Sequence, residues 1–277
     1  MKNELVRRVE LTFTINEQNI ILQKAYQKDN YKEIVIDANK KLCYIFFSGN
    51  GIYFPDTEEV FTRTILECDR YEWENVANSK ELLEKSGKYI FVRDIYKCWY
   101  AKGINEKINS IDKLYEQLKK MTMGYRVITV GNSAGGYMAV LLGNMLKADL
   151  IYDFSGQVYL KNEKGKYRDI CNYVSGNVMY FFPAGCDYDI QQYKRIKNKE
   201  ICAFGFKTNT HGMSMYKANM PFVLTQNKDY LLELYKHYKN RQIVREEFFI
   251  RTCGWRAFIG TIVKGGIKKI RKNIHLK

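Results

Sequence analysis

A serine between closely spaced glycines is the clearest chemical feature of the sequence. Ser133 lies at the centre of Gly131-Asn132-Ser133-Ala134-Gly135, a match to G-x-S-x-G. An apolar, β-branched run precedes the motif and an apolar, helix-like run follows it. This order predicts a strand, a sharp turn that exposes the serine hydroxyl, and a helix. Three fixed positions match by chance in roughly one chain of this length in ten, so a glycine-rich turn with an uninvolved serine is the alternative.

Two carboxylates and a histidine follow the serine, each in a loop after a predicted strand. Asp187 and Asp189 follow the aromatic run Val178–Phe182, and His211 follows Ile201–Phe206. A histidine can take the proton of a serine hydroxyl, and a carboxylate can hold that histidine in the required tautomer. The alternative for His211 is an ordinary surface-loop residue.

The choice of carboxylate stays open between two residues. We favour Asp187 because Ile190, three residues on, resembles the apolar position that often follows the acid in this loop of serine hydrolases, and we keep Asp189 as the alternative. The carboxylate that does not contact the histidine is expected to cap the helix that follows.

The ordered series of serine, acid and histidine resembles the α/β-hydrolase superfamily over about residues 5–238. The resemblance implies a mostly parallel central sheet with helices on both faces and an antiparallel N-terminal edge. It also implies an oxyanion hole of backbone amides: that of Ala134, and that of Gly49 or Asn50 in the loop after the strand Leu42–Phe47. The His-Gly-Gly run of some members is missing here, so the second amide stays open between these two residues.

The remaining elements follow from hydrophobic periodicity. We predict an amphipathic crossover helix from apolar residues at helical spacing between Ile104 and Leu118, and a second helix over Lys228–Tyr238. A helix or cap is expected within Phe54–Cys68, and a lid-like insertion over Val158–Asn172. The other predicted strands are Leu5–Ile15, Asn19–Gln27, Glu33–Asp37, Lys88–Val92 and Ala148–Phe154.

Two aromatic residues stand where a ligand would be expected. Trp99 and Tyr100 lie in the loop after the strand Lys88–Val92, and ligands of open α/β sheets gather at such strand ends. They are candidates for substrate binding, with packing as the alternative.

Composition favours one catalytic domain, residues 1–238, and a basic tail, residues 239–277. The 277 residues are 46% hydrophobic, which is enough for one sizeable α/β core. The seven cysteines are scattered without a C-x-x-C pair, so neither a disulfide framework nor a metal site is expected, and Cys186 is expected to be a wall residue. We find no signal peptide and no spanning segment, which favours a cytoplasmic protein.

The tail carries most of the net charge of +15. From Tyr235 to Lys277 there are twelve Lys or Arg against two acids, 12 − 2 = +10, interleaved with Trp, Phe and Ile. This pattern is typical of a helix on an anionic membrane surface, here the inner face of the membrane, or of a protein-binding segment. A solvated helix is the alternative, and no nucleic-acid recognition motif accompanies the charge.

The sequence therefore predicts a serine esterase that works through an acyl-enzyme and needs no metal or cofactor. The loose pattern DFSGQ, FFPAGCDYDIQQ and HG resembles small hydrolase-like proteins of bacterial surface-polysaccharide loci, which implies an O-acyl group on a glycan as substrate. The alternatives are an acyltransferase of polysaccharide biosynthesis with the same three residues, and a non-catalytic, membrane-associated assembly partner.

Overall fold

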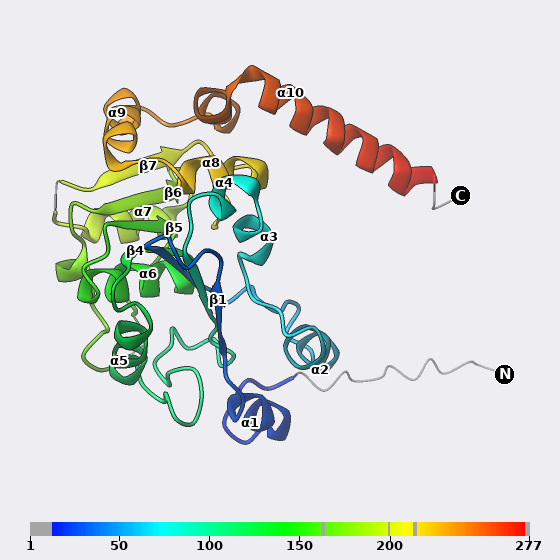
Figure 1. The fold of residues 1–277 in the computed structure, drawn as a ribbon, viewed down its shortest axis with the longest axis vertical. Helices are drawn as coiled ribbons and strands as arrows, with labels where there is room; N and C mark the ends of the chain where they lie inside the picture. The colour runs from blue at the N-terminus through cyan, green and yellow to red at the C-terminus, as the bar shows by residue number, and fades with distance from the viewer. Residues whose placement is uncertain (1–12, 162–163, 199, 213–214, 275–277) are drawn as a thin grey trace.

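The computed structural model describes residues 13–161, 164–198, 200–212 and 215–274, with the backbone alone for 265–274. Within these residues, seven strands form one sheet in the order β1-β3-β2-β4-β5-β6-β7 (Figure 1). The first strand is antiparallel to β3, and all other neighbours are parallel. This confirms the predicted fold class. The strands are β1 (Tyr31–Val35), β2 (Leu42–Phe47), β3 (Lys88–Val92), β4 (Arg126–Asn132), β5 (Leu150–Phe154), β6 (Val178–Pro183) and β7 (Cys202–Phe206).

Helices cover both faces of the sheet, because its strands are apolar on both sides. One face packs against α5 (Ile111–Met121) and α6 (Ala134–Met145). The opposite face packs against α3 (Glu74–Ala77), α4 (Lys80–Leu83), α8 (Met220–Leu224) and α9 (Lys228–Tyr238), of which α9 has the predicted bounds. The parallel sheet is thus buried between two layers.

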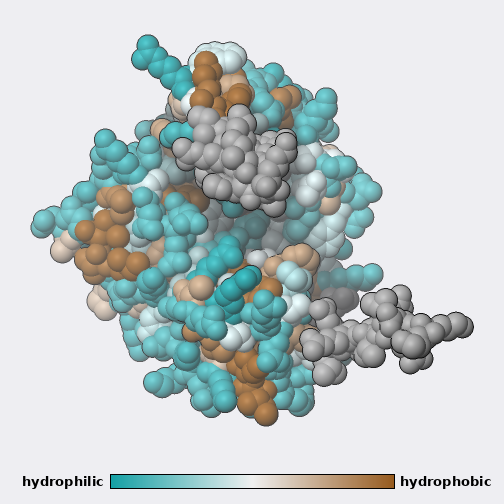
Figure 2. Space-filling model, turned by 90° about the vertical axis from the view of Figure 1, so that its right-hand side faces the viewer, coloured by the Kyte–Doolittle hydropathy of each residue, from teal (hydrophilic) through white to brown (hydrophobic). Residues whose placement is uncertain are grey.

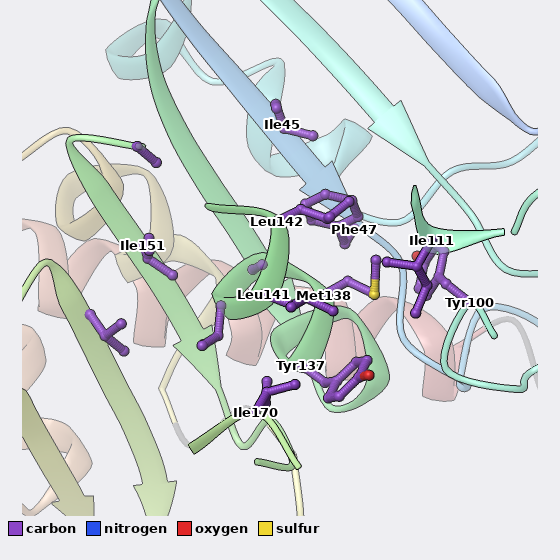
Figure 3. Close-up of a cluster of buried hydrophobic side chains, with 14 of the residues drawn as sticks. Ile45, Phe47, Tyr100, Ile111, Tyr137, Met138, Leu141, Leu142, Ile151 and Ile170 are labelled. Carbon is purple, nitrogen blue, oxygen red and sulfur yellow. The ribbon is translucent and has the colours of Figure 1, made fainter. Parts of the chain in front are cut away.

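The helix after Ser133 is the most buried helix of the first layer. Its residues 134–143 are all buried, so α6 is apolar around its whole circumference. Figure 3 shows Tyr137, Met138, Leu141 and Leu142 of α6 among side chains of β2, β5 and α5. A helix fixed on all sides gives the serine at its N-terminus a fixed position.

The N-terminal predictions are partly wrong. The segment predicted as strand Asn19–Gln27 is a helix, α1 (Ile20–Tyr26), because the Asn19 side chain accepts hydrogen bonds from the amides of Ile21 and Leu22 and starts it. Most of the predicted strand Leu5–Ile15 lies outside the described residues. The predicted strand at Glu33–Asp37 exists as β1, two residues earlier.

The crossover helix is shorter than predicted. Ile104 and Ile108 are in a loop, where the Asn105 side chain accepts the amides of Lys107 and Ile108, and Ser110 then caps α5. The predicted helix within Phe54–Cys68 is confirmed as α2 (Glu58–Phe61) followed by a π-helix, Thr62–Glu67. The other short elements are 3₁₀ turns at Cys171–Tyr173 and Lys217–Asn219, and the helix α7 (Asp187–Arg195) after β6.

The chain continues to pack on the domain beyond Tyr238. Ile243 lies beside β7, where its amide donates to Gly205 and its carbonyl accepts from Lys207, both at 2.8 Å. The last helix, α10 (Arg245–Ile274), has the fully buried Phe248 in its first turn. At Gly254 the backbone leaves helical geometry, with φ of 82°, and the remainder of α10 extends away from the domain (Figure 1). In the described part of the chain, no helix is long and apolar enough to cross a membrane.

Glycine is required before the serine by the close approach of two backbone segments. A Cβ on Gly131 would lie 2.0 Å from the carbonyl oxygen of Gly135, whereas a Cβ on the exposed Gly51 would meet nothing within 4 Å. Gly131→Ala should therefore lower the free energy of unfolding by about 3 kcal/mol or more, at the upper end of overpacking costs. Gly51→Ala is the matched control for the altered entropy of the unfolded chain. Urea unfolding measures both variants, and equal stability would contradict the packing described.

A buried carboxyl group lies beneath the turn that carries the serine. Asp153 of β5 is fully buried and accepts the amide of Gly156 at 2.6 Å. A Cβ on either Gly136 or Gly156 would come within 2.3 Å of its Oδ1. Burial raises the pKa of Asp153 to about 8; the Gly156 amide opposes this rise and the charge of Asp189 adds to it.

This raised pKa makes the stability of the fold depend on pH. In the unfolded chain Asp153 ionises near its ordinary pKa of 3.8, but in the folded protein it stays protonated up to about pH 8. The free energy of unfolding should therefore be highest below about pH 4 for this group and fall as the pH rises toward 8. Asp153→Asn, which keeps an acceptor for Gly156, should reduce this fall. Urea unfolding at pH 5 and pH 8 tests this. If the free energy of unfolding falls by the same amount between these pH values in wild type and Asp153→Asn, Asp153 is not the cause of the fall.

Candidate active site

Ser133 occupies a strained turn between β4 and α6. Its φ is 53° and its ψ is −119°, an unusual conformation for a residue other than glycine. The Ser133 amide donates to the carbonyl of Phe154 at 2.9 Å, which ties the turn to the end of β5. A Cβ on Gly135 would come within 2.3 Å of the Phe47 carbonyl, so the turn also presses on the end of β2. These contacts fix the serine hydroxyl at the carboxyl edge of the sheet.

His211 lies against the serine. Its Nε2 is 3.0 Å from Ser133 Oγ, and its Nδ1 is 2.9 Å from Oδ2 and 3.0 Å from Oδ1 of Asp189. The three side chains thus form one hydrogen-bonded series. Ser133 follows β4, Asp189 follows β6 and His211 follows β7. The carboxylate end is enclosed, since the Asp189 side chain is 1% exposed, whereas the imidazole is 37% exposed and can be reached by a substrate.

The expectation that Asp187 faces the histidine is wrong, because the structure puts Asp189 there. Both residues are in the first turn of α7, and side chains two positions apart on a helix point in directions about 200° apart. Asp189 is buried toward His211, and Asp187 is exposed to solvent at the helix N-terminus. Ile190 alone does not distinguish the two carboxylates, because their directions depend on the helical phase of α7.

The predicted oxyanion amides differ in availability. Ala134 is the first residue of α6, so its amide has no acceptor within the helix. The amide of Gly49 instead donates to Oε2 of Glu72 at 2.6 Å. The third candidate is Asn50, whose side-chain amide lies 3.4 Å from the carbonyl of Lys97 and whose side-chain oxygen is buried without a hydrogen-bond partner in the described protein.

No pattern in the sequence points to Glu72 as a residue of the site. It is partly buried, its own amide donates to Ser48 Oγ at 3.3 Å, and its carboxylate accepts from Gly49, so the two segments hold each other. Burial raises its pKa, while the bond from Gly49 and the side chain of Asn132 oppose that rise. Glu72 is 23 residues from Gly49 along the chain, and no motif in the sequence links these two residues.

The two aromatic candidates have different surroundings. Tyr100 is fully buried, and its hydroxyl donates to the carbonyls of Ser48 and Val92, so it packs under the loop and cannot bind a substrate. This corrects its assignment as a binding residue. Trp99 is partly exposed, and its Nε1 donates to Gln157 Oε1 at 2.9 Å.

A buried carboxylate shapes the loop that carries both aromatics. Asp94 is 3% exposed and accepts the backbone amides of Tyr96, Cys98 and Tyr100 at 3.0, 2.7 and 2.8 Å. Burial raises the pKa of Asp94 to about 6, and the three amides oppose this rise. The loop tolerates positive φ at Lys97, Trp99 and Tyr100, as expected where a buried acceptor fixes the backbone.

A cavity of about 200 Å³ opens beside Trp99. It is bounded by residues from the start of α5, from α6 and from the insertion after β5, and its walls combine aromatic and charged groups. They include Trp99, Tyr137, Tyr167, Asp112, Lys166 and Arg168. A series of side-chain contacts leads from Trp99 toward His211. Gln157, the partner of Trp99, also interacts with Tyr188, and the ring centroids of Tyr188 and His211 are 5.8 Å apart.

Comparison with known proteins gives only structural similarity. No protein-family model matches the chain, and no curated protein matches its sequence. A protein of unknown function from Staphylococcus aureus subsp. aureus Mu50 is similar at 12% identity and a TM-score of 0.43, covering 80% of this chain and 94% of its own.

Two further solved structures are similar. One, from Xanthomonas campestris pv. campestris and assigned as a hydrolase of the α/β superfamily, has 10% identity and a TM-score of 0.37, with 72% of this chain and 99% of that chain covered. The other, a bifunctional GH43-CE protein of Bacteroides eggerthii, has 10% identity and a TM-score of 0.39, with 78% and 34% covered. At these values the similarities carry no argument about activity. By its strand order, its antiparallel edge and its serine turn, the chain has an α/β-hydrolase fold.

Proposed function

We propose that the protein is a serine esterase that removes an O-acyl group from a glycan through an acyl-enzyme. The observation that carries this proposal is the hydrogen-bonded series of Ser133, His211 and Asp189. A serine at a strained turn with a histidine on its hydroxyl and a buried carboxylate on the far ring nitrogen is the arrangement that activates a serine for attack on an acyl carbon.

The reaction follows from these three groups. His211 Nε2 takes the proton of Ser133 as Oγ bonds to the ester carbonyl carbon, and Asp189 stabilises the resulting imidazolium. The tetrahedral intermediate collapses when His211 gives that proton to the departing sugar oxygen. Water then attacks the acyl-serine with His211 again as base, which releases the acid and restores Ser133.

The negative charge on the intermediate needs backbone donors. We assign one to the amide of Ala134, which lies at the positive end of the α6 dipole. We assign the second to the amide of Asn50, because that of Gly49 is engaged by Glu72. In this assignment Glu72 is a positioning residue that fixes the loop by binding the neighbouring amide.

Several polar groups near Ser133 suit a substrate rich in hydroxyls. The side-chain oxygens of Asn50 and Asn132 are buried without hydrogen-bond partners among the described residues. These oxygens have almost no surface accessible to solvent, so they can accept a sugar hydroxyl only if the side chains around them shift when the substrate binds. The cavity beside Trp99 offers an aromatic wall with cations for the remainder of a glycan, and side-chain contacts lead from Trp99 through Gln157 and Tyr188 toward His211.

The assignment of the acid is tested by paired variants with p-nitrophenyl acetate as probe. Asp189→Asn should lower kcat by about 10³- to 10⁴-fold, because an amide cannot hold the required histidine tautomer. Asp187→Asn removes an exposed carboxylate on the same helical turn and should change kcat by less than about threefold. A larger loss in Asp187→Asn than in Asp189→Asn would contradict the assignment.

A fluorophosphonate probe separates the esterase from a non-catalytic assembly partner. The wild-type protein should be labelled and Ser133→Ala should not, because the probe reacts with the activated hydroxyl. If the wild type is unlabelled, or Ser133→Ala is labelled equally, the protein is not a serine enzyme.

A second experiment separates the hydrolase from the alternative acyltransferase. With an acylated oligosaccharide as donor, a hydrolase releases the free acid, whereas an acyltransferase moves the acyl group to an added sugar.

The role of Glu72 is tested with two variants. Glu72→Gln keeps an acceptor for the Gly49 amide and should keep kcat within about threefold of wild type, whereas Glu72→Ala leaves that amide unpaired and should lower kcat by roughly tenfold or more with little change in KM. Far-ultraviolet circular dichroism controls for folding. If both variants lose activity equally, the carboxylate has another role than accepting this amide.

A further inference from the structure

The last helix is divided into two parts of opposite character. Residues 245–253 pack on the domain: Phe248 and Phe249 are buried, and Thr252 Oγ1 and Cys253 Sγ reach Asn219 Oδ1 at 2.6 and 2.8 Å. At Gly254 the backbone turns out of helical geometry, and the second part runs away from the domain (Figure 1). The first part therefore anchors the second part to the fold.

The second part carries an apolar face that no other described part of the chain covers. Trp255, Ile259, Ile262 and Val263 are between 52% and 64% exposed. They follow one another at spacings of four, three and one residues, which puts them on one side of a helix. Phe258, at the edge of this face, contacts the rings of Tyr216 and Phe249 on the domain, whereas the four residues themselves stay exposed within the described part of the chain. Burial of these four large apolar side chains would remove much apolar surface from water, so association through this face is favourable.

The charge of this segment indicates what the face contacts. From Phe248 to Lys277 the sequence has eight Lys or Arg and no Asp or Glu. Arg256 and Lys264 are exposed, and neither has a carboxylate partner within the described residues. Figure 2, which views the molecule from the side toward which α10 extends, shows brown and teal residues next to each other at the top of the molecule.

We propose that the segment of α10 after Gly254 is an interfacial helix that binds the protein to an anionic lipid surface. Its apolar face enters the boundary between headgroups and acyl chains, and its cations contact anionic headgroups. A bilayer surface accounts for the continuous apolar face and for the one-sided excess of positive charge together. The kink at Gly254 separates the membrane helix from the anchoring helix, so the domain can stand off the surface.

The test is flotation of the full-length protein with vesicles of phosphatidylcholine, with and without phosphatidylglycerol. We expect binding to the anionic vesicles, weaker binding to pure phosphatidylcholine, and a loss of binding at high salt. Ile259→Gln/Ile262→Gln should weaken binding by on the order of 100-fold. Ile20→Gln/Met123→Gln, which removes two apolar side chains that are 64% and 77% exposed elsewhere, is the matched control and should bind as wild type does.

A second pair of variants tests the charge. Arg256→Gln/Lys264→Gln should weaken binding to anionic vesicles by roughly 30-fold, at about 1 kcal/mol per cation near such a surface, and should leave binding to phosphatidylcholine unchanged. Light scattering on each variant checks the oligomeric state. Equal binding to both vesicle types, no binding by the wild type at low salt, or a stable dimer that Ile259→Gln/Ile262→Gln dissociates would overturn the proposal, the last in favour of a second copy of the chain.

Discussion

The close approach of backbone at Gly131 and Gly135 is the constraint on which the site depends. It lets β4 end and α6 begin within a single residue, and it leaves Ser133 in a conformation that the surrounding structure must enforce. Enforcement comes from α6, which is buried around its circumference, and from the end of β5, which binds the serine amide. The strain at the serine is therefore balanced by the packing of a whole helix.

Three buried carboxyl groups near the site differ in their hydrogen-bond partners, and the pKa values of two of them differ accordingly. Asp189 is enclosed but has the imidazole of His211 as partner, Asp94 has three backbone amides, and Asp153 has one amide. The fewer donors such a group has, the more burial favours its neutral form, and the pKa of about 6 for Asp94 and of about 8 for Asp153 follow this order. The turn that carries Ser133 thus lies above a carboxyl group whose raised pKa favours the neutral form at pH 7, which limits the negative charge beside Asp189.

Much of the central fold could be predicted because its strands are buried on both faces and read as apolar runs. The order of Ser133, the acid loop and His211 could be predicted for the same reason, since each follows such a strand. The N-terminal segment could not be predicted in this way. Its residue types favour a strand, but the side chain of Asn19 accepts two backbone amides and starts a helix. The role of Tyr100 and the contact of Glu72 with Gly49 depend on loops that meet only in the folded chain.

The segment around Ile243 has a consequence for the edge of the sheet. β7 is the last strand, and its backbone would be open to pairing with another chain if nothing lay beside it. Ile243 exchanges two backbone hydrogen bonds with Gly205 and Lys207, and Phe248 covers the neighbouring aromatic rings. The chain after Tyr238 therefore occupies the edge of β7 at residues 205–207 and keeps another strand from pairing there. A shortened protein that ends before Ile243 would expose the backbone of β7 at Gly205 and Lys207, whereas one that ends at Gly254 would keep it covered.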